Sequence, residues 1–173
     1  MSKEETKKED KKFWIFLGIL AIVCILLRLF VFEFFHISGS SMIPTFEDGD
    51  YVFAEQISVY TKDISYDDIV IVEYPNGKPC VKRVIGTAGD TVEIKDGILV
   101  LNGKKIQEEY INEQMYDSME PITVKENMIF VMGDNRNYSL DSRDPNVGAI
   151  PYGKIKGKVR FTVFPLSRIR IIK

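Results

Sequence analysis

An apolar segment near the N-terminus constrains this chain more than any other feature. Residues 13–27 contain no charged side chain, and the apolar run resumes after Arg28. A helix of about 20 apolar residues crosses the hydrocarbon core of a bilayer, and an arginine near its end can extend to the interface. The sequence therefore predicts a basic N-terminal segment over residues 1–12, a transmembrane anchor over 13–35 and one further domain over 36–173.

The lysines before this segment predict its orientation. Local lysine and arginine counts keep the more basic side of a membrane helix in the cytoplasm. We therefore expect a single-pass protein of the cell membrane, with residues 36–173 outside the cytoplasm. The alternative is a cleaved export signal ending at the small residues 38–40. We favour the anchor, because the bulky residues 30–35 extend the apolar run beyond the core of an ordinary export signal.

The composition argues against several classes of partner and cofactor. The chain has 23 basic and 25 acidic residues, with no basic stripe interleaved with aromatic residues, so nucleic acid is not an expected partner. Cys24 lies in the apolar segment and Cys80 beyond it, so we expect both thiols to be free. Two cysteines and the single His36 do not suffice for a zinc site of these residue types. We expect no metal and no cofactor.

After residue 41 the pattern changes to short runs rich in β-branched and aromatic residues, separated by turn residues. Asp96-Gly97 and Asn102-Gly103 supply the positive φ angles of type I′ turns and predict a three-stranded meander. The sequence therefore predicts a mainly β domain with antiparallel sheets. Its expected strands cover residues 68–74, 80–85, 91–95, 98–101, 104–106, 128–132 and 159–164. The polar, poorly periodic residues 108–121 are expected to form a mobile surface excursion.

Ser41 follows the apolar segment so closely that it lies within about 20 Å of its end. A serine nucleophile needs a base. His36 is too close in sequence to reach back without a sharp fold, and an interfacial role suits it better. Lys82 is the alternative, because its strand neighbours are apolar and burial lowers a lysine pKa. At the ordinary pKa of about 10.4, only about 0.04% of a lysine is neutral at pH 7. Lys82 could instead protect the edge of a sheet.

A third cluster, residues 133–144, follows an apolar strand and is dense in opposite charges. Such runs are usually solvated loops. Asp134, Arg136, Asp141 and Arg143 could instead form a buried ion-pair lattice that fixes this loop against the strand of Lys82. Ser139 could then hydrogen-bond the lysine amine.

These blocks, in this order, resemble bacterial type I signal peptidases, in the short form with one N-terminal anchor that is typical of Gram-positive bacteria. The resemblance covers nearly the whole chain and rests on residues 41–45, 82–86 with 89–90, and 133–143. It implies a mainly antiparallel β fold with an apolar surface near the membrane. It also implies cleavage of signal peptides from exported preproteins, after small residues at the first and third positions before the bond. The implied partners are these preproteins and the lipid bilayer.

The resemblance also assigns roles to individual residues. Ser41 is implied as the nucleophile and Lys82 as the general base, with Ser139 bonding the lysine. The remaining implied positions are supporting or structural: Asp134, Arg136, Asp141 and Arg143. Met42 is expected to pack beside the serine or the substrate.

Gly39 departs from the Gram-negative branch of the family, where a serine two positions before the nucleophile contributes to the oxyanion hole. The Ser41 N–H then needs another partner, and one candidate is a backbone amide that Gly39 frees.

Two other function classes stay open. One is a self-cleaving regulator that also uses serine and lysine, although such proteins carry a DNA-binding module and here only twelve residues precede the apolar segment. The other is a membrane-tethered β module without activity, including an inactive paralogue. The joint presence of Ser41, Lys82 and Ser139 favours the enzyme.

Overall fold

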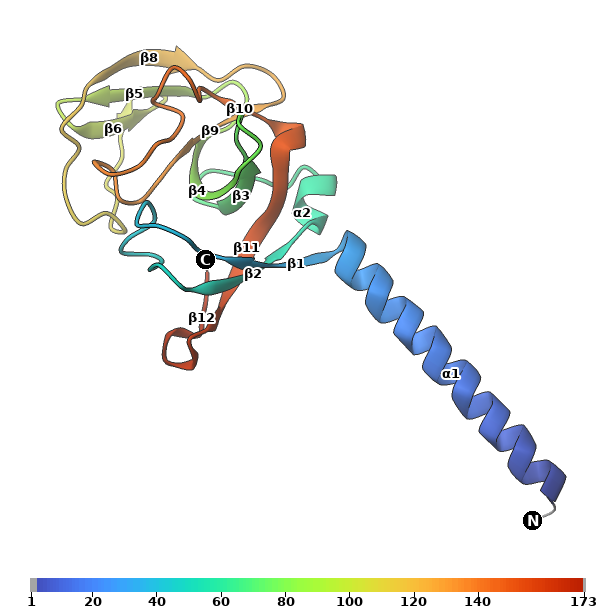
Figure 1. Ribbon diagram of the computed structural model, residues 1–173. Coiled ribbons are helices and arrows are strands. Elements are labelled where there is room, and N and C mark those ends of the chain that lie inside the picture. The colour runs from blue at the N-terminus through green and yellow to red at the C-terminus, as the bar shows by residue number, and fades with distance from the viewer. Residues whose placement is uncertain (1–2, 173) are drawn as a thin grey trace.

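The chain consists of one long helix and a β domain at its C-terminal end (Figure 1). The computed structural model describes residues 3–172, with side chains from residue 10 onward except at 29 and 30. Helix α1 (Lys3–Phe30) projects away from the β domain, whereas the C-terminus lies beside it. Within the part of the chain so described, no helix has the length and apolar character that a membrane span requires.

Strand β1 changes the predicted extent of the N-terminal segment. The helix ends at Phe30, and β1 (Phe32–His36) pairs antiparallel with β2 (Tyr51–Glu55), so residues 32–35 belong to the β domain. Aromatic residues favour strands because their side chains pack across neighbouring strands. The ring centroids of Phe32 and Phe34 lie 5.1 and 5.5 Å from that of Phe53 on β2. Residues 32–35 therefore form a strand because their aromatic rings pack across the sheet, although their apolar character predicted a continuation of the helix.

The β domain contains two antiparallel sheets (Figure 1). The strand order is β1-β2-β11-β3-β4-β9-β10 in the large sheet, where β12 also pairs with β11, and β7-β6-β5-β8 in the small sheet. The remaining strands are β3 (Ile69–Glu73), β4 (Pro79–Gly86), β5 (Thr91–Lys95), β6 (Ile98–Leu101), β7 (Lys104–Lys105), β8 (Met119–Thr123), β9 (Met128–Met132), β10 (Ile150–Pro151), β11 (Ile155–Phe164) and β12 (Arg170–Ile171). Residues 3–172 also include three short helical turns: α2 (Ile57–Tyr60), η1 (Tyr152–Lys154) and η2 (Leu166–Arg168).

The predicted meander is confirmed, and β5, β6 and β7 pair in sequence order. Asp96 and Gly97 have φ of 52° and 73°, and Asn102 and Gly103 have 53° and 76°, as type I′ turns require. The predicted strand over 128–132 matches β9, and the one over 159–164 forms the second half of β11. Cys24 and Cys80 are free thiols, as predicted.

Strand β4 is central rather than an edge strand. It pairs with β3 on one side and β9 on the other, with Lys82 opposite Val70. The interpretation of Lys82 as a lysine that protects a sheet edge is therefore wrong. An internal position in the sheet instead surrounds the lysine with protein.

The turn between β1 and β2 is anchored by its own apolar side chains. Met42 and Phe46 are each 1% exposed and pack in one cluster with residues of β2, β3, β4 and β11. Burial of a side chain of this size contributes about 1.5–3 kcal/mol. Met42 is thus a packing residue, as predicted, and it holds the neighbouring Ser41 against the sheet.

Residues 108–121 were predicted to form a mobile surface excursion, but parts of this segment are paired in a sheet or buried. Most of the segment is irregular, but its end forms part of β8, which pairs with β5. Met115 is 4% exposed, and the Glu108 side chain is 2% exposed. The polar composition of the segment predicted exposure to solvent. The Glu108 carboxylate is instead buried, because it pairs with the buried Arg136.

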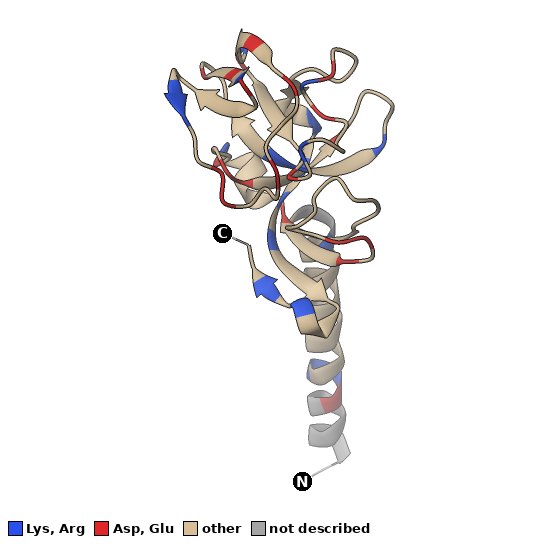
Figure 2. Cartoon of the chain, turned by 90° about the vertical axis from the view of Figure 1, so that its left-hand side faces the viewer, with Lys and Arg blue, Asp and Glu red and all other residues tan. Residues whose placement is uncertain are grey.

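Figure 2 shows acidic and basic residues interspersed along the backbone of the β domain. The same view shows the described part of α1 as mostly uncharged beyond its start, and basic residues along the C-terminal strand.

Candidate active site

Ser41 and Lys82 meet although they lie 41 positions apart in the chain. Ser41 is in the turn after β1, and Lys82 is in the middle of β4. The Lys82 Nζ lies 2.6 Å from the Ser41 Oγ. Lys82 is only 3% exposed, whereas Ser41 is partly exposed. The amine therefore reaches the hydroxyl from the protein interior.

The surroundings of Lys82 favour its neutral form. Burial lowers the pKa of the amine from its ordinary value of 10.5, and the negative charges of Asp141 and Asp134 only partly oppose this effect. Asp141 is already paired with Arg143, whose positive charge lowers the Lys82 pKa further. A neutral amine has a free lone pair, so Lys82 can accept the proton of a hydroxyl at hydrogen-bond distance.

Asn135 holds the backbone of the serine turn. Its N–H donates to the carbonyl of Ser41 at 3.0 Å, and its side-chain amide donates to the carbonyl of Ser40 at 3.0 Å. Asn135 was not among the site residues predicted from the sequence. Its position directly after Asp134 in the third block is the only indication that the sequence offers.

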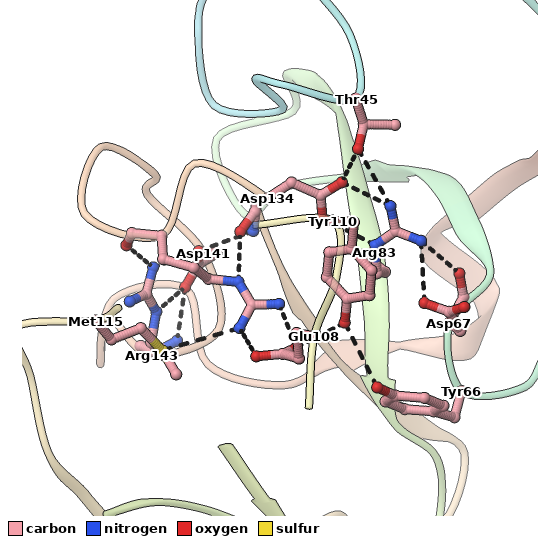
Figure 3. Close-up of polar contacts among 12 residues, drawn as sticks. Thr45, Tyr66, Asp67, Arg83, Glu108, Tyr110, Met115, Asp134, Asp141 and Arg143 are labelled. Carbon is pink, nitrogen blue, oxygen red and sulfur yellow. Dashed lines mark hydrogen bonds and ion pairs between the residues drawn. The ribbon is translucent and has the colours of Figure 1, made fainter. Parts of the chain in front are cut away.

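Asp134, Arg136, Asp141 and Arg143, the residues predicted to form a lattice, take part in buried ion pairs. Figure 3 labels Asp134, Asp141 and Arg143. Asp141 accepts from Arg143 at 2.8 and 2.9 Å and from the Gly133 N–H at 3.0 Å. Burial alone would raise the pKa of the Asp141 carboxyl, but the hydrogen bonds and charge of Arg143, with the Gly133 N–H, lower it overall. Asp141 and Arg143 therefore support the strand end beside Ser41.

Asp134 and Arg136 take their ion-pair partners from outside the block. Asp134 accepts from Arg83 at 2.9 and 2.6 Å and from the hydroxyl of Thr45. Arg136 pairs with Glu108. The predicted lattice thus exists, but sequence reasoning missed Arg83, the neighbour of Lys82, and Glu108 in the supposed excursion.

Ser139 lies near the site without the predicted bond to Lys82. Among the described residues, its Oγ makes no hydrogen bond to the lysine amine; it lies 3.5 Å from the Leu140 carbonyl and contributes a hydrogen bond to Asp141. A Cβ added to Gly133 would come within 2.2 Å of this Oγ. Ser139 therefore packs over Gly133, which turns its hydroxyl toward the carboxylate instead of the amine.

Gly39 does not leave its own amide free. It has φ of +98°, a conformation that favours glycine, and its N–H donates to Asp48 Oδ1 at 2.8 Å. The Gly39 N–H is therefore engaged, and a second oxyanion donor from another backbone amide stays a prediction. The Ser41 N–H has no acceptor among the described residues and can serve as one donor.

A cavity of about 100 Å³ opens beside Ser41 between the serine turn and the start of β4. Its walls are largely apolar, and its volume suits small side chains. It is lined by Phe35, His36, Ile37, Ser38, Ser41, Met42, Pro79, Cys80 and Val81. Within the described chain, no group of three or more histidine, cysteine or acidic side chains could hold a metal ion.

A β domain in which a buried lysine amine contacts a serine hydroxyl defines a candidate serine hydrolase. The comparisons with known proteins are more specific. The family described as "Signal peptidase, peptidase S26" matches residues 11–164. The chain belongs to this family, and the predicted resemblance to bacterial type I signal peptidases is confirmed.

Individual relatives agree with this assignment. The chain is 36% identical over 181 residues to a signal peptidase I of Bacillus licheniformis, covering 97% of each chain. It is 36% identical to signal peptidase I T of Bacillus subtilis (strain 168), covering 90% of this chain and 86% of that relative. A crystal structure of a signal peptidase I from Enterococcus faecalis V583 is similar, with a TM-score of 0.50 and 32% identity; it covers 55% of this chain and 95% of that one.

Proposed function

We propose that this protein is a membrane-bound endopeptidase that removes signal peptides from exported preproteins, with Ser41 as the nucleophile and Lys82 as the general base. The observation that carries the proposal is the 2.6 Å contact between the Ser41 hydroxyl and a lysine amine that is 3% exposed. Among the described residues, no histidine takes this place, because His36 packs on Tyr51 at a ring distance of 4.8 Å.

The reaction follows from this contact. Lys82 Nζ takes the Ser41 proton while Oγ attacks the carbonyl carbon of the scissile bond, and the Ser41 N–H donates to the oxygen that becomes negative. The resulting lysine ammonium then protonates the leaving amine as the carbon–nitrogen bond breaks. This step leaves an ester on Ser41. In the second half, Lys82 takes a proton from the attacking water and returns it to Ser41 Oγ as the ester bond breaks.

The cavity beside Ser41 supports this substrate class. A space of about 100 Å³ with largely apolar walls is the proposed site for a small side chain next to the scissile bond. Cleavage after small residues is what the family resemblance implies. The names of the relatives, which are signal peptidases I, support the same class of substrate.

The N-terminal helix is proposed as the membrane anchor, with residues 1–12 in the cytoplasm and the β domain on the other side. Support comes from the charge-free stretch 13–27, which lies wholly within α1. Its large side chains are exposed along the helix, including Trp14 at 67% and Ile22 at 58%. Such a surface is stable in lipid, whereas water would make its exposure costly.

The test is cleavage of a labelled preprotein by the detergent-solubilised chain and its variants. Ser41→Ala and Lys82→Ala are expected to lose nearly all activity while their circular dichroism stays that of the native fold. Ser40→Ala and Lys78→Ala are the matched controls, because they remove a neighbouring hydroxyl and an exposed amine. Normal processing by Ser41→Ala or by Lys82→Ala would disprove the proposed pair.

A further inference from the structure

We propose that Glu108 and Tyr110, in the irregular segment between β7 and β8, are positioning residues that align Ser41 with Lys82. This inference rests on the proposed function. The two residues touch neither reactive atom. They act through Arg136, which binds the carbonyl of Gly133 beside the serine turn, and through Arg83, which follows Lys82 in β4. Figure 3 shows Glu108 and Tyr110 together with Arg83.

Glu108 holds Arg136 by a two-point contact in the protein interior. The Arg136 Nη1 and Nη2 atoms lie 2.7 and 2.6 Å from the two oxygens of Glu108, and the exposed fractions of the side chains are 0% and 2%. Bidentate pairs of this kind fix geometry. A fully buried ion pair gives little net stability. The main effect of this pair is therefore to fix the position of the Arg136 side chain.

Arg136 transmits this alignment to the nucleophile. Its Nε donates to the Gly133 carbonyl at 2.9 Å. Gly133 lies so close to the serine turn that an added Cβ would come within 2.4 Å of the Ser41 carbonyl oxygen. Two residues further on, Asn135 donates to that same carbonyl at 3.0 Å. A displaced Arg136 therefore moves the backbone on which the Ser41 turn rests.

Tyr110 connects the same segment to the strand of the base. Its hydroxyl donates to Glu108 Oε1 at 2.6 Å, and its ring centroid lies 3.8 Å from the guanidinium carbon of Arg83. Burial and the negative charge of Glu108 raise the pKa of Tyr110, so the phenol keeps its proton for this bond. Arg83 directly follows Lys82 in β4 and also binds Asp134.

One segment thus supports both reactive groups, the hydroxyl through Arg136 and the amine through Arg83. A misplacement of about 1 Å in a catalytic site can cost roughly 10²-fold in rate. The two groups meet at 2.6 Å, so a small displacement of either one breaks their contact. We therefore expect changes at Glu108 to reduce the rate of the chemical step rather than the binding of substrate.

The first experiment compares Glu108→Gln with Glu109→Gln in the full-length protein, with kcat and KM measured on a labelled preprotein. Glu109 is the adjacent, exposed glutamate. Glu108→Gln should lower kcat roughly 10- to 100-fold with KM within about twofold, and Glu109→Gln should leave both unchanged. Equal kcat values for the two variants would overturn the proposal.

A second pair of variants separates positioning from folding. Glu108→Gln leaves the buried charge of Arg136 unpaired, which lowers the unfolding temperature. The double variant Glu108→Gln/Arg136→Met removes that charge as well, so its unfolding temperature should recover. Its kcat should stay low, because the Gly133 carbonyl has lost its donor. Recovery of kcat together with stability would show that the pair acts only on folding.

A milder change keeps the test decisive if Glu108→Gln does not fold. Tyr110→Phe removes one hydroxyl and keeps the ring over Arg83, and Tyr116→Phe is its exposed control. Tyr110→Phe should lower kcat several-fold, while Tyr116→Phe should not; equal rates would contradict the role of Tyr110. If the native chain cleaves and Ser41→Ala does not, the proposed function stands whatever these variants show.

Discussion

At the scale of the residue, the burial of Lys82 lowers the stability of the fold but suits the amine to act as a base. It is almost fully buried, and among the described residues it forms no ion pair, because the nearby Asp141 is paired with Arg143. Burial of a charge without a dedicated partner is costly, so the group favours its neutral form. The same burial, by lowering the pKa of the amine, makes its neutral, basic form more abundant at a given pH.

Replacement of Lys82 by Met should therefore abolish cleavage and raise stability by about 1 kcal/mol at pH 7, as at other functional sites where a costly group is removed. Between the lowered pKa of the folded chain and the ordinary value of 10.5, Lys82 binds less of a proton in the folded chain than in the unfolded chain, so its contribution to stability rises with pH across that window. The difference in the free energy of unfolding between the Met variant and the native chain should therefore decrease as the pH rises. Urea unfolding at pH 7 and at pH 10 measures both effects, and a Met variant less stable than the native chain at pH 7 would contradict them.

The sequence identifies the chemical groups of the site better than their partners. Ser41, Lys82 and the charged residues of the third block stand out by type and order, and the structure brings them together. Glu108 and Arg83 do not stand out, because strand periodicity tells which face a residue occupies and not which distant side chain it meets. Ser139 lies in the right region, but its hydroxyl direction depends on its packing over Gly133.

At the scale of the element, the turn between β5 and β6 is the surface on which the 108–118 segment rests. Gly97 in this turn lies against Met115, and Gln114 donates to the Asp96 carbonyl at 2.5 Å. The Asp-Gly dipeptide predicts the turn itself, because it supplies the positive φ angles. The docking of the later segment was missed, since that contact involves residues with no periodic pattern.

Two glycine substitutions should distinguish the backbone cost of replacing a turn glycine from the cost of disturbing the contact between the β5–β6 turn and the 108–118 segment. Gly97 and Gly103 both have positive φ, so Ala at either site should cost roughly 1–2 kcal/mol. An added Cβ at Gly97 would also come within 2.2 Å of the Met115 carbonyl, whereas nothing lies within 4 Å of one at Gly103. Gly97→Ala should therefore lower the free energy of unfolding by clearly more than Gly103→Ala in urea titrations. Equal losses would show that the segment does not dock on this turn.

At the scale of the whole molecule, the serine turn lies close to the helix end. Only β1 separates α1 from the turn, so the proposed anchor and Ser41 are joined by a single short strand (Figure 1). The aromatic side chains of β1 continue across the large sheet, where Phe53 of β2 also contacts Phe161 of β11 at a ring distance of 5.7 Å. The candidate active site is therefore joined to the end of α1 through a strand that is paired within the large sheet.

Two arginines in the middle of α1 test the proposed anchor. Each arginine near the centre of a membrane helix costs about 2.5–3.5 kcal/mol on insertion scales. The double variant Leu20→Arg/Ile22→Arg should move from the membrane pellet to the supernatant during alkaline extraction, whereas the native chain should stay in the pellet. Ile122→Arg, on an exposed position of β8, is the control and should behave as the native chain does. Release of the native chain under the same conditions would contradict the anchor.

The central claim is that a neutral Lys82 removes the Ser41 proton, and the pH dependence of kcat/KM on a labelled preprotein tests it most directly. Because only the neutral amine is active, kcat/KM should rise about tenfold per pH unit in the acidic range and level off at the Lys82 pKa. Burial lowers this pKa, so the plateau should begin below 10.5. A flat profile, or a rise that continues to 10.5 and beyond, would contradict the account.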